Sequence, residues 1–225
     1  MHGRKYRNAA ATCGVVFVNS EFTSRDVIET LGIPSERVRV ARPAPKDVFR
    51  ADGPRSDLGA PYILTVATLE PRKNLQALIE AHRLLGGELL LAVVGAEGWG
   101  EQPLLDDTRI RRLGYVSDEE LASLYRGAAA AVYPSRFEGF GIPVIEAMAC
   151  GVPVVVSSHE SLDEASGDAA VRADPDDPAA IAAAIERALA ERERLVGAGL
   201  EHSRRFTWRE VGEIFLQGYE EAAER

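Results

Sequence analysis

The chain has 225 residues, of which 46% are hydrophobic and 27% charged, and its formal net charge is −9 at pH 7. No apolar run approaches the roughly 20 residues that a membrane-spanning helix needs. The negative charge argues against nucleic-acid binding as the main activity, because a basic surface is needed to neutralise a nucleic-acid backbone. We expect a cytoplasmic globular protein, and its two distant cysteines predict neither a disulfide framework nor a metal site.

The first fifty residues differ in charge from the rest of the chain. They carry nine Lys and Arg against five Asp and Glu, a balance of +4, so the remainder must carry −13. The next segment, "ADGPRSDLGA" at 51–60, combines Gly, Pro and charge without periodicity, as is typical of a linker. We predict a separate N-terminal part at 1–50, a linker at 51–60, a main domain at 61–205 and a C-terminal helix at 206–225.

Short β-rich runs alternate with amphipathic segments along the chain. The candidate strands are 14–20, 37–43, 62–68, 88–96, 129–135 and 152–158, and the candidate helices are 24–32, 73–87, 117–129, 143–150, 178–195 and 208–225. Ser117 with Glu120, and Thr207 with Glu210, match the capping box that starts a helix. The alternation predicts an α/β fold with a Rossmann-like, doubly wound parallel sheet that is covered by helices on both faces.

Two glutamates stand in the otherwise apolar and glycine-rich run "RFEGFGIPVIEAMACGVPVVVSS". Gly139 and Gly141 disfavour a helix at Glu138, whereas Pro143 suits a first helical position. We therefore expect Glu138 in the loop at the carboxyl end of a strand, where open α/β sheets bind ligands, and Glu146 about one turn into the next helix. Carboxylates there can accept hydrogen bonds from sugar hydroxyls, beside a helix N-terminus that attracts phosphate. On spacing alone, two solvent-exposed glutamates are an equal alternative.

A basic pair follows the strand at 62–68. Arg72 and Lys73 are expected at the start of a helix, at the same edge of the sheet as Glu138. Two cations and the helix dipole together suit a diphosphate. Simple surface charge is the alternative interpretation.

Two further turns are expected at this edge. Gly95, Gly98 and Gly100 follow the strand at 88–96 and are flexible enough to approach a ligand, although they lack the spacing of a dinucleotide fingerprint. Val116 follows "GY" and is a candidate neighbour for a nucleotide base.

These motifs in this order resemble the donor-binding half of glycosyltransferase family four (group 1), the retaining group with the GT-B fold. The resemblance runs from about Gly14 to the C-terminus and is carried by "TLEPRKNL", "GYVSDEELASLYRGAAAAVYPSRFEGFGIPVIEAMACGVPVVVSS", "DAAVRADPDDPAAIAAAI" and "FTWREV". Its most specific element is the Glu-x7-Glu spacing of Glu138 and Glu146 around a Gly-Phe-Gly sequence.

The resemblance implies a role for each matched residue. Glu138 is implied as the catalytic residue that faces the donor sugar, and Glu146 as the residue that binds the nucleotide ribose. Lys73 is implied to bind the diphosphate, with Arg72 as a helper. No metal and no cofactor is expected, because cations and helix dipoles stabilise the leaving diphosphate in this family. The backbone implied to lie near the sugar and phosphates comprises Gly139, Phe140, Gly141 and Ile142.

The implied function is transfer of a hexosyl group, mannose or glucose, from a nucleoside diphosphate sugar to a hydroxyl acceptor with retention and without a metal. Two departures from the family pattern bear on it. Thr68 stands where many members carry an arginine, so Arg72 has to compensate. Residues 1–50 resemble only the end of the family's N-terminal acceptor domain, and the acceptor-side residues, including a histidine near the sugar, have no counterpart.

Two other functions remain open. One is a non-catalytic nucleotide-sugar-binding module, or an inactive truncated remnant, that needs a separate acceptor-domain partner. The other is a different GT-B reaction, such as epimerisation or phosphorolysis of a sugar. Trp208, Phe215 and Tyr219 are expected to pack against residues 1–50 and to leave apolar surface, which an acceptor-domain chain or a second copy would cover. Peripheral contact of the protein with a membrane surface also remains open.

Overall fold

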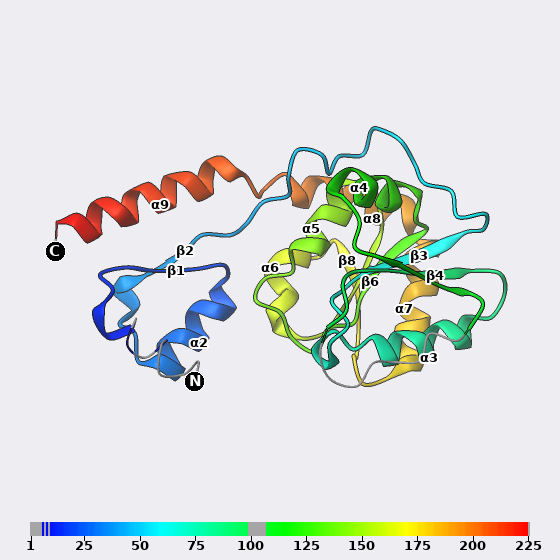
Figure 1. Ribbon diagram of the computed structural model, residues 1–225, viewed down its shortest axis with the longest axis horizontal. Coiled ribbons are helices and arrows are strands. Elements are labelled where there is room, and N and C mark those ends of the chain that lie inside the picture. The colour runs from blue at the N-terminus through cyan, green and yellow to red at the C-terminus, as the bar shows by residue number, and fades with distance from the viewer. Residues whose placement is uncertain (1–5, 7, 9, 99–106, 225) are drawn as a thin grey trace. The chain divides into compact units, whose positions relative to one another are not determined.

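The computed structural model describes residues 6, 8, 10–98 and 107–224 and divides into two compact units (Figure 1). Unit 1 comprises Met1–Ala44 and Phe206–Arg225, and unit 2 comprises Pro45–Arg205. The division falls ahead of the segment expected as a linker. Arg126 accounts for this, because its Nε donates to the main-chain oxygen of Pro54 at 2.6 Å and its Nη1 to that of Arg50 at 3.1 Å.

Unit 2 is built on a parallel six-stranded sheet in the order β5-β4-β3-β6-β7-β8. The strands are β3 (Tyr62–Val66), β4 (Leu90–Val94), β5 (Ile110–Gly114), β6 (Ala130–Tyr133), β7 (Val154–Ser157) and β8 (Ala170–Ala173). The helices are α3 (Leu75–Leu85), α4 (Asp118–Gly127), α5 (Ile142–Ala149), α6 (Asp163–Ser166), α7 (Pro178–Ala190) and α8 (Arg192–Ser203). The predicted α/β fold with a Rossmann-like, doubly wound parallel sheet is confirmed.

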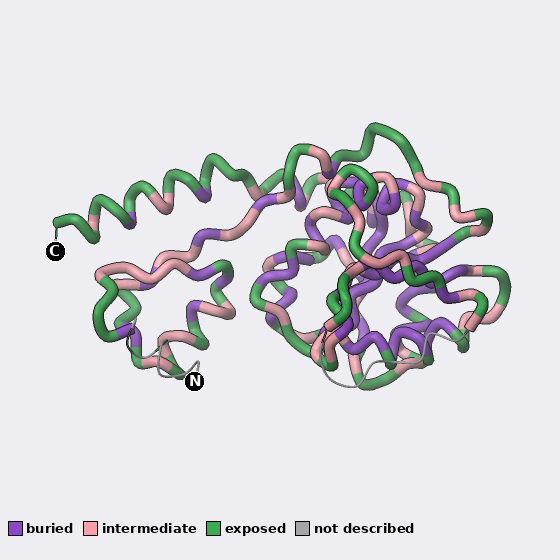
Figure 2. The backbone as a smooth tube through the Cα atoms, viewed as in Figure 1, coloured by how far each residue is buried: buried purple, intermediate pink, exposed green. Residues whose placement is uncertain are grey.

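The inner strands are buried on both faces (Figure 2). Ile63, Leu91 and Val132 share one core cluster with apolar residues of α3 and α7. Their neighbours in the strands, such as Leu64 and Ala131, are also fully buried. Because successive side chains in a strand point to opposite faces, helices must cover both faces of the sheet, as Figure 1 shows for α3 and α7 on one side and α4, α5 and α8 on the other.

Two strands, β5 and β8, were not among the sequence-based candidates. They form the two edges of the sheet. In β5, the exposed and charged residues Arg111 and Arg112 interrupt the apolar sequence of a short strand. Arg172 interrupts the sequence of β8 in the same way. Charged residues are common on edge strands because they discourage pairing with another chain. They also break the apolar run that identifies a strand in sequence.

The helix predicted at 178–195 is wrong in its extent. The structure has two helices there, α7 and α8, which are separated at Glu191 with φ −96° and ψ 20°. The break has a packing reason, because α7 lies against α3 whereas α8 lies against α5. Arg192 holds the turn, since its Nη1 donates to the main-chain oxygen of Ala129 at 2.5 Å.

Unit 1 contains a two-stranded parallel sheet of β1 (Val16–Val18) and β2 (Val38–Val40), connected by α2 (Glu21–Leu31), and the C-terminal helix α9 (Trp208–Ala223). Phe215 of α9 stacks on Phe17 of β1 with ring centroids 4.3 Å apart, and Tyr219 meets the same ring edge-on at 5.6 Å. Trp208 is 53% exposed. That these segments belong to an acceptor domain stays a prediction.

In the described part of the chain, no helix combines the length and the apolar character that crossing a bilayer requires. The cytoplasmic location stays a prediction.

Candidate functional site

The strand order defines a switch point between β3 and β6. From β3 the chain proceeds outward through β4 to β5, and from β6 it proceeds outward in the other direction through β7 to β8. The loops that leave β3 and β6 at their carboxyl ends therefore diverge to opposite sides. In open α/β sheets such a divergence leaves a crevice in which ligands bind. The loops concerned, 67–74 and 134–141, contain the sequence-predicted basic pair and Glu138.

The basic pair lies in a 3₁₀ turn and not in the helix itself. The turn spans Pro71–Lys73, and α3 begins only at Leu75, so the predicted helix start at Lys73 was early by two residues. Asn74 separates the two elements with φ 56°, an uncommon conformation for a residue other than glycine. Its Nδ2 donates to the main-chain oxygens of Pro134 at 3.1 Å and Pro175 at 2.6 Å. Asn74 thus ties the turn to the ends of β6 and β8.

Glu138 forms ion pairs with both members of the basic pair. Its Oε1 lies 2.7 Å from Lys73 Nζ, and its Oε2 lies 2.6 Å from Arg72 Nη1. The exposed fractions of the three side chains are only 13% for Glu138, 16% for Lys73 and 27% for Arg72. Arg72 also donates from Nη2 to Glu70 at 2.6 Å and lies over the ring of Phe137. The structure therefore brings the three predicted residues into one partly buried cluster.

The pKa of Glu138 lies below its usual value despite its burial. Burial acts to raise this pKa, but the charge and hydrogen bond of Lys73, with hydrogen bonds from Ser135 and Arg72, together outweigh it. Hydrogen bonds and nearby cations favour the charged form of a carboxyl group. Glu138 is therefore ionised at neutral pH.

The backbone of Glu138 is held by the loop that follows β7. The Glu138 N–H donates to Ser161 Oγ at 2.9 Å, and Ser161 is 2% exposed. His159 Nδ1 lies 2.9 Å from the same hydroxyl and accepts from the Ser161 N–H at 3.2 Å. Because a backbone N–H can only donate, His159 Nδ1 accepts from the Ser161 N–H, while the Ser161 hydroxyl oxygen accepts from the Glu138 N–H.

The glycine loop leads from Glu138 into α5. Gly139 is exposed, Phe140 is 2% exposed, and Ile142, at the start of α5, is 39% exposed. Gly141 precedes the helix with φ 101°, and a Cβ at this position would lie 2.7 Å from Leu162 Cδ2. Only glycine suits this backbone and this contact. The loop therefore makes a tight entry into α5.

Glu146 lies on α5 beside a different set of charges. Lys46 Nζ pairs with Asp118 Oδ2 at 2.5 Å, and both residues act on the Glu146 carboxyl. Burial, and then the charge of Asp118, raise the pKa of Glu146 to about 7, against a smaller opposing effect of Lys46. Val116, half-buried, lies between β5 and the start of α4 at Asp118. Glu146 is thus a carboxyl group that changes charge near neutral pH.

Several residues around the predicted ones were missed by sequence reasoning. Their types are common in loops and at helix starts, so no single one carries a signal without the fold. Ser161 is the clearest case, because only the proximity of the β6 and β7 loops brings it to Glu138. The missed residues are Lys46, Glu70, Asn74, Asp118, Ser135 and Ser161. Of the predicted turn at Gly95, Gly98 and Gly100, the last lies outside the described residues.

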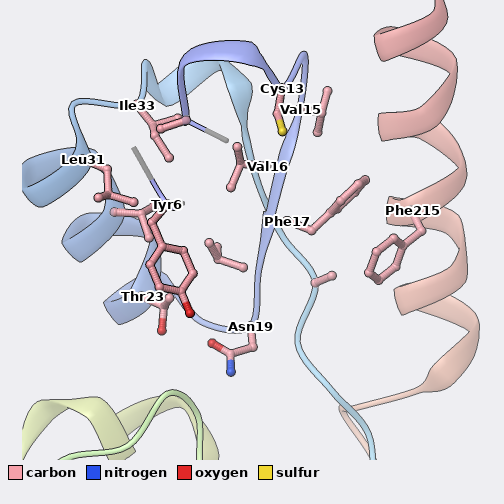
Figure 3. Close-up of a pocket in the computed structure, with 14 residues that line it drawn as sticks. Tyr6, Cys13, Val15, Val16, Phe17, Asn19, Thr23, Leu31, Ile33 and Phe215 are labelled. Atoms are coloured by element: carbon pink, nitrogen blue, oxygen red, sulfur yellow. The ribbon is translucent and has the colours of Figure 1, made fainter. Parts of the chain in front are cut away.

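Unit 1 has a separate cavity of about 560 Å³ that contains none of the predicted site residues (Figure 3). Apolar side chains of β1, α2 and α9 line it, with Val16, Leu31 and Ile33 pointing inward. Thr23 and Asn19 are polar members of the lining. The cavity is therefore suited to apolar packing and differs in character from the charged cluster of unit 2.

Comparison with known proteins places the charged cluster inside a recognised family region. The family model described as "Glycosyl transferases group 1" matches residues 51–202. The chain is 37% identical over 217 residues to O-antigen chain mannosyltransferase B of Escherichia coli, covering 86% of this chain and 57% of that protein. The chain thus spans about half the length of this relative.

Two solved structures share the fold at low sequence identity. A glycosyltransferase from Rickettsia africae matches with a TM-score of 0.80 at 17% identity, covering 94% of this chain and 64% of that chain. Anabaena Alr3699/HepE, solved in complex with UDP and glucose, matches with a TM-score of 0.77 at 21% identity. The match covers 94% of this chain and 63% of that chain.

Proposed function

Because the chain belongs to the glycosyl transferases group 1 family, we propose that it transfers a hexosyl group from a nucleoside diphosphate sugar to a hydroxyl acceptor. The observation that carries the proposal is the meeting of Arg72, Lys73 and Glu138 at the switch point of the sheet. Mannose is the proposed hexose, since the relative that is 37% identical is named a mannosyltransferase. Glucose is the alternative.

Arg72 and Lys73 are the proposed diphosphate ligands. Transfer breaks the bond between the anomeric carbon and a phosphate oxygen and forms a bond from that carbon to the acceptor oxygen. The electron pair of the broken bond leaves with the diphosphate, which takes up the proton of the acceptor hydroxyl. Two preorganised cations in a partly buried site stabilise this developing charge. In the proposal no metal and no cofactor takes part, and Arg72 supplies the second cation that Thr68 cannot.

Glu138 and Glu146 have different proposed roles. Glu138 is the proposed catalytic residue, with its carboxylate directed at the sugar hydroxyls, and reaction with retention is proposed from the family resemblance. Glu146 is the proposed ribose ligand, because an ionised carboxylate accepts hydrogen bonds from two neighbouring hydroxyls. Val116 is proposed to border the base. The backbone proposed to contact the sugar and phosphates comprises Gly139, Phe140, Gly141 and Ile142.

An acceptor-binding part is proposed to complete unit 1. The two-stranded sheet and the apolar cavity beside it support this, because two strands with one crossover helix bury little apolar surface. The chain covers 57% of the mannosyltransferase relative, which leaves room in such proteins for a further domain. A hydroxyl of a glycan is the proposed acceptor. Self-association of this chain is the alternative way to cover the surface.

A thermal-shift panel tests the donor site. UDP, GDP and ADP, with their glucose and mannose conjugates, would be compared on the wild type and on Glu146→Ala. A ligand at about a hundred times its dissociation constant should add roughly 2.7 kcal/mol, and each kcal/mol corresponds to about 2–4 °C. We expect a base-selective shift in the wild type that Glu146→Ala loses. No shift with any nucleotide would reject the proposal, and binding without transfer to any acceptor would favour the non-catalytic module.

A further inference from the structure

Glu138 accepts hydrogen bonds from both proposed diphosphate ligands, Arg72 and Lys73. Arg72 Nη1 donates to Glu138 Oε2 at 2.6 Å and to the main-chain oxygen of Phe137 at 2.9 Å. Each Nη of a guanidinium carries two hydrogens, so both hydrogens of this nitrogen are donated within the protein. Lys73 Nζ in turn donates to Glu138 Oε1 at 2.7 Å. A phosphate oxygen can therefore reach Arg72 Nη1 only by replacing one of its two acceptors.

The backbone of Glu138 is anchored within its loop. Its N–H is bonded to the buried Ser161 hydroxyl at 2.9 Å, and the next residues are fixed by the burial of Phe140 and by the tight turn at Gly141. Rotation about the side-chain torsions of Glu138 relocates the carboxylate without breaking these contacts. The carboxylate therefore stays close to any diphosphate that binds the two cations.

The carboxylate and the diphosphate compete because both are anions. The low pKa of Glu138, set by Lys73, Ser135 and Arg72 against the effect of burial, keeps this group charged at neutral pH. Like charges in a partly buried site repel, and water screens them less than at the surface. A diphosphate that displaces Glu138 from the cations leaves a charged group that needs new hydrogen-bond donors.

A hexose supplies those donors, whereas a nucleoside diphosphate without sugar does not. We propose that the Glu138 carboxylate is a specificity-determining group that disfavours the nucleoside diphosphate product relative to the nucleoside diphosphate sugar. The proposal rests on the proposed donor site. Sugar hydroxyls replace Arg72 and Lys73 as partners of Glu138 in the donor complex, and once the sugar has left, the carboxylate competes again for the cations and helps to expel the product.

Binding measurements on the full chain test this inference. Isothermal titration calorimetry would be run with UDP, GDP and ADP and with UDP-glucose, GDP-mannose and ADP-glucose, on the wild type, Glu138→Gln and Asp176→Asn. Asp176 pairs with Arg136, which lies in the same loop as Glu138, and Asp176 forms no ion pair with Arg72 or Lys73 among the described residues. Its substitution therefore removes the same charge close to the site without touching the basic pair. We expect Glu138→Gln to bind the nucleoside diphosphate roughly tenfold more tightly, while the conjugate gains no affinity. Asp176→Asn should leave the ratio of the two dissociation constants unchanged.

The outcomes separate the inference from the function on which it rests. If the wild type binds nucleotides but Glu138→Gln binds the nucleoside diphosphate equally or more weakly, the inference is wrong and the donor site stands. The inference also fails if Asp176→Asn tightens binding as much, since the effect is then one of net charge. If the wild type binds no nucleotide, the proposed function itself fails, and the inference with it. Glu138→Ala provides the same comparison should Glu138→Gln not fold.

Discussion

Lys73 Nζ lies 2.7 Å from Glu138 Oε1 although 65 positions separate the two residues in the chain. The contact joins the loop after β3 to the loop after β6, across the switch point of the sheet. Both side chains are largely buried, with exposed fractions of 16% and 13%. The same contact therefore contributes to the stability of unit 2 and to the charge of the proposed diphosphate site.

Removal of Lys73 should separate these two contributions. Lys73→Ala leaves Glu138 with Arg72 as its remaining cation. We expect the free energy of unfolding, measured with urea, to fall by about 1–3 kcal/mol. Adding Glu138→Gln should restore part of this stability, because it removes a partly buried carboxylate that has lost one of its two cations. Nucleoside diphosphate binding should be lost in both variants. A Lys73→Ala protein as stable as the wild type would show that the pair contributes no net stability.

Glu146 should make stability depend on pH. Its pKa of about 7 in the folded protein exceeds the ordinary value of 4.5, so the folded state binds more protons between these values and its stability falls as pH rises through this range. Glu146→Gln lacks this loss and should exceed the wild type in stability at pH 8 by up to about 3 kcal/mol, with a smaller difference at pH 5.

Urea unfolding across pH 5–8 measures this difference. Glu191→Gln is a control on the surface, because hydrogen bonds from Arg187 and Arg194 lower the pKa of Glu191. Its difference from the wild type should stay constant over the same range. A pH-independent difference for Glu146→Gln would mean that this carboxyl group titrates at its ordinary value.

Gly141 and Gly197 should respond in opposite ways to alanine. At Gly141 the φ of 101° and the 2.7 Å approach of a Cβ to Leu162 should make alanine destabilising by about 1–3 kcal/mol. Gly197 is exposed within α8, with nothing within 4 Å of a Cβ, so alanine there should stabilise by about 0.5–1 kcal/mol. Thermal unfolding of the two variants measures the contrast. Equal effects would contradict the tight turn at Gly141.

Phe215 should hold α9 within unit 1. Phe215→Ala removes the ring that stacks on Phe17 at 4.3 Å, and we expect a local loss of about 1–2 kcal/mol because the ring is only half-buried. Hydrogen exchange should become faster for the amides of α9 and β1, while the amides of the unit 2 sheet keep their protection. Leu216→Ala is the control, since this neighbouring side chain is 59% exposed. Unchanged exchange in α9 would mean that the stacking does not hold the helix.

Part of the fold could be predicted because it depends on local patterns. The inner strands are short apolar runs, and Ser117 and Thr207 cap α4 and α9 through hydrogen bonds from Glu120 N and Glu210 N, as their spacing predicted. The edge strands β5 and β8 and the break at Glu191 could not be predicted in this way. The conformation of these segments depends on the neighbour against which each one packs, and that neighbour is distant in the chain.

The placement of Glu138 in a loop at the carboxyl end of a strand followed from its flanking glycines and Pro143 alone, since backbone conformation there is a local property. Its partners did not follow. Parallel strands require long crossovers, so the sheet order brings residues from positions 72, 138 and 161 together only after folding. The charges of the site, a low pKa at Glu138 and a raised one at Glu146, arise from that burial and those neighbours. The sequence alone thus determines which ionisable residues the site contains. The tertiary contacts that desolvate these residues determine their ionisation and their pairing.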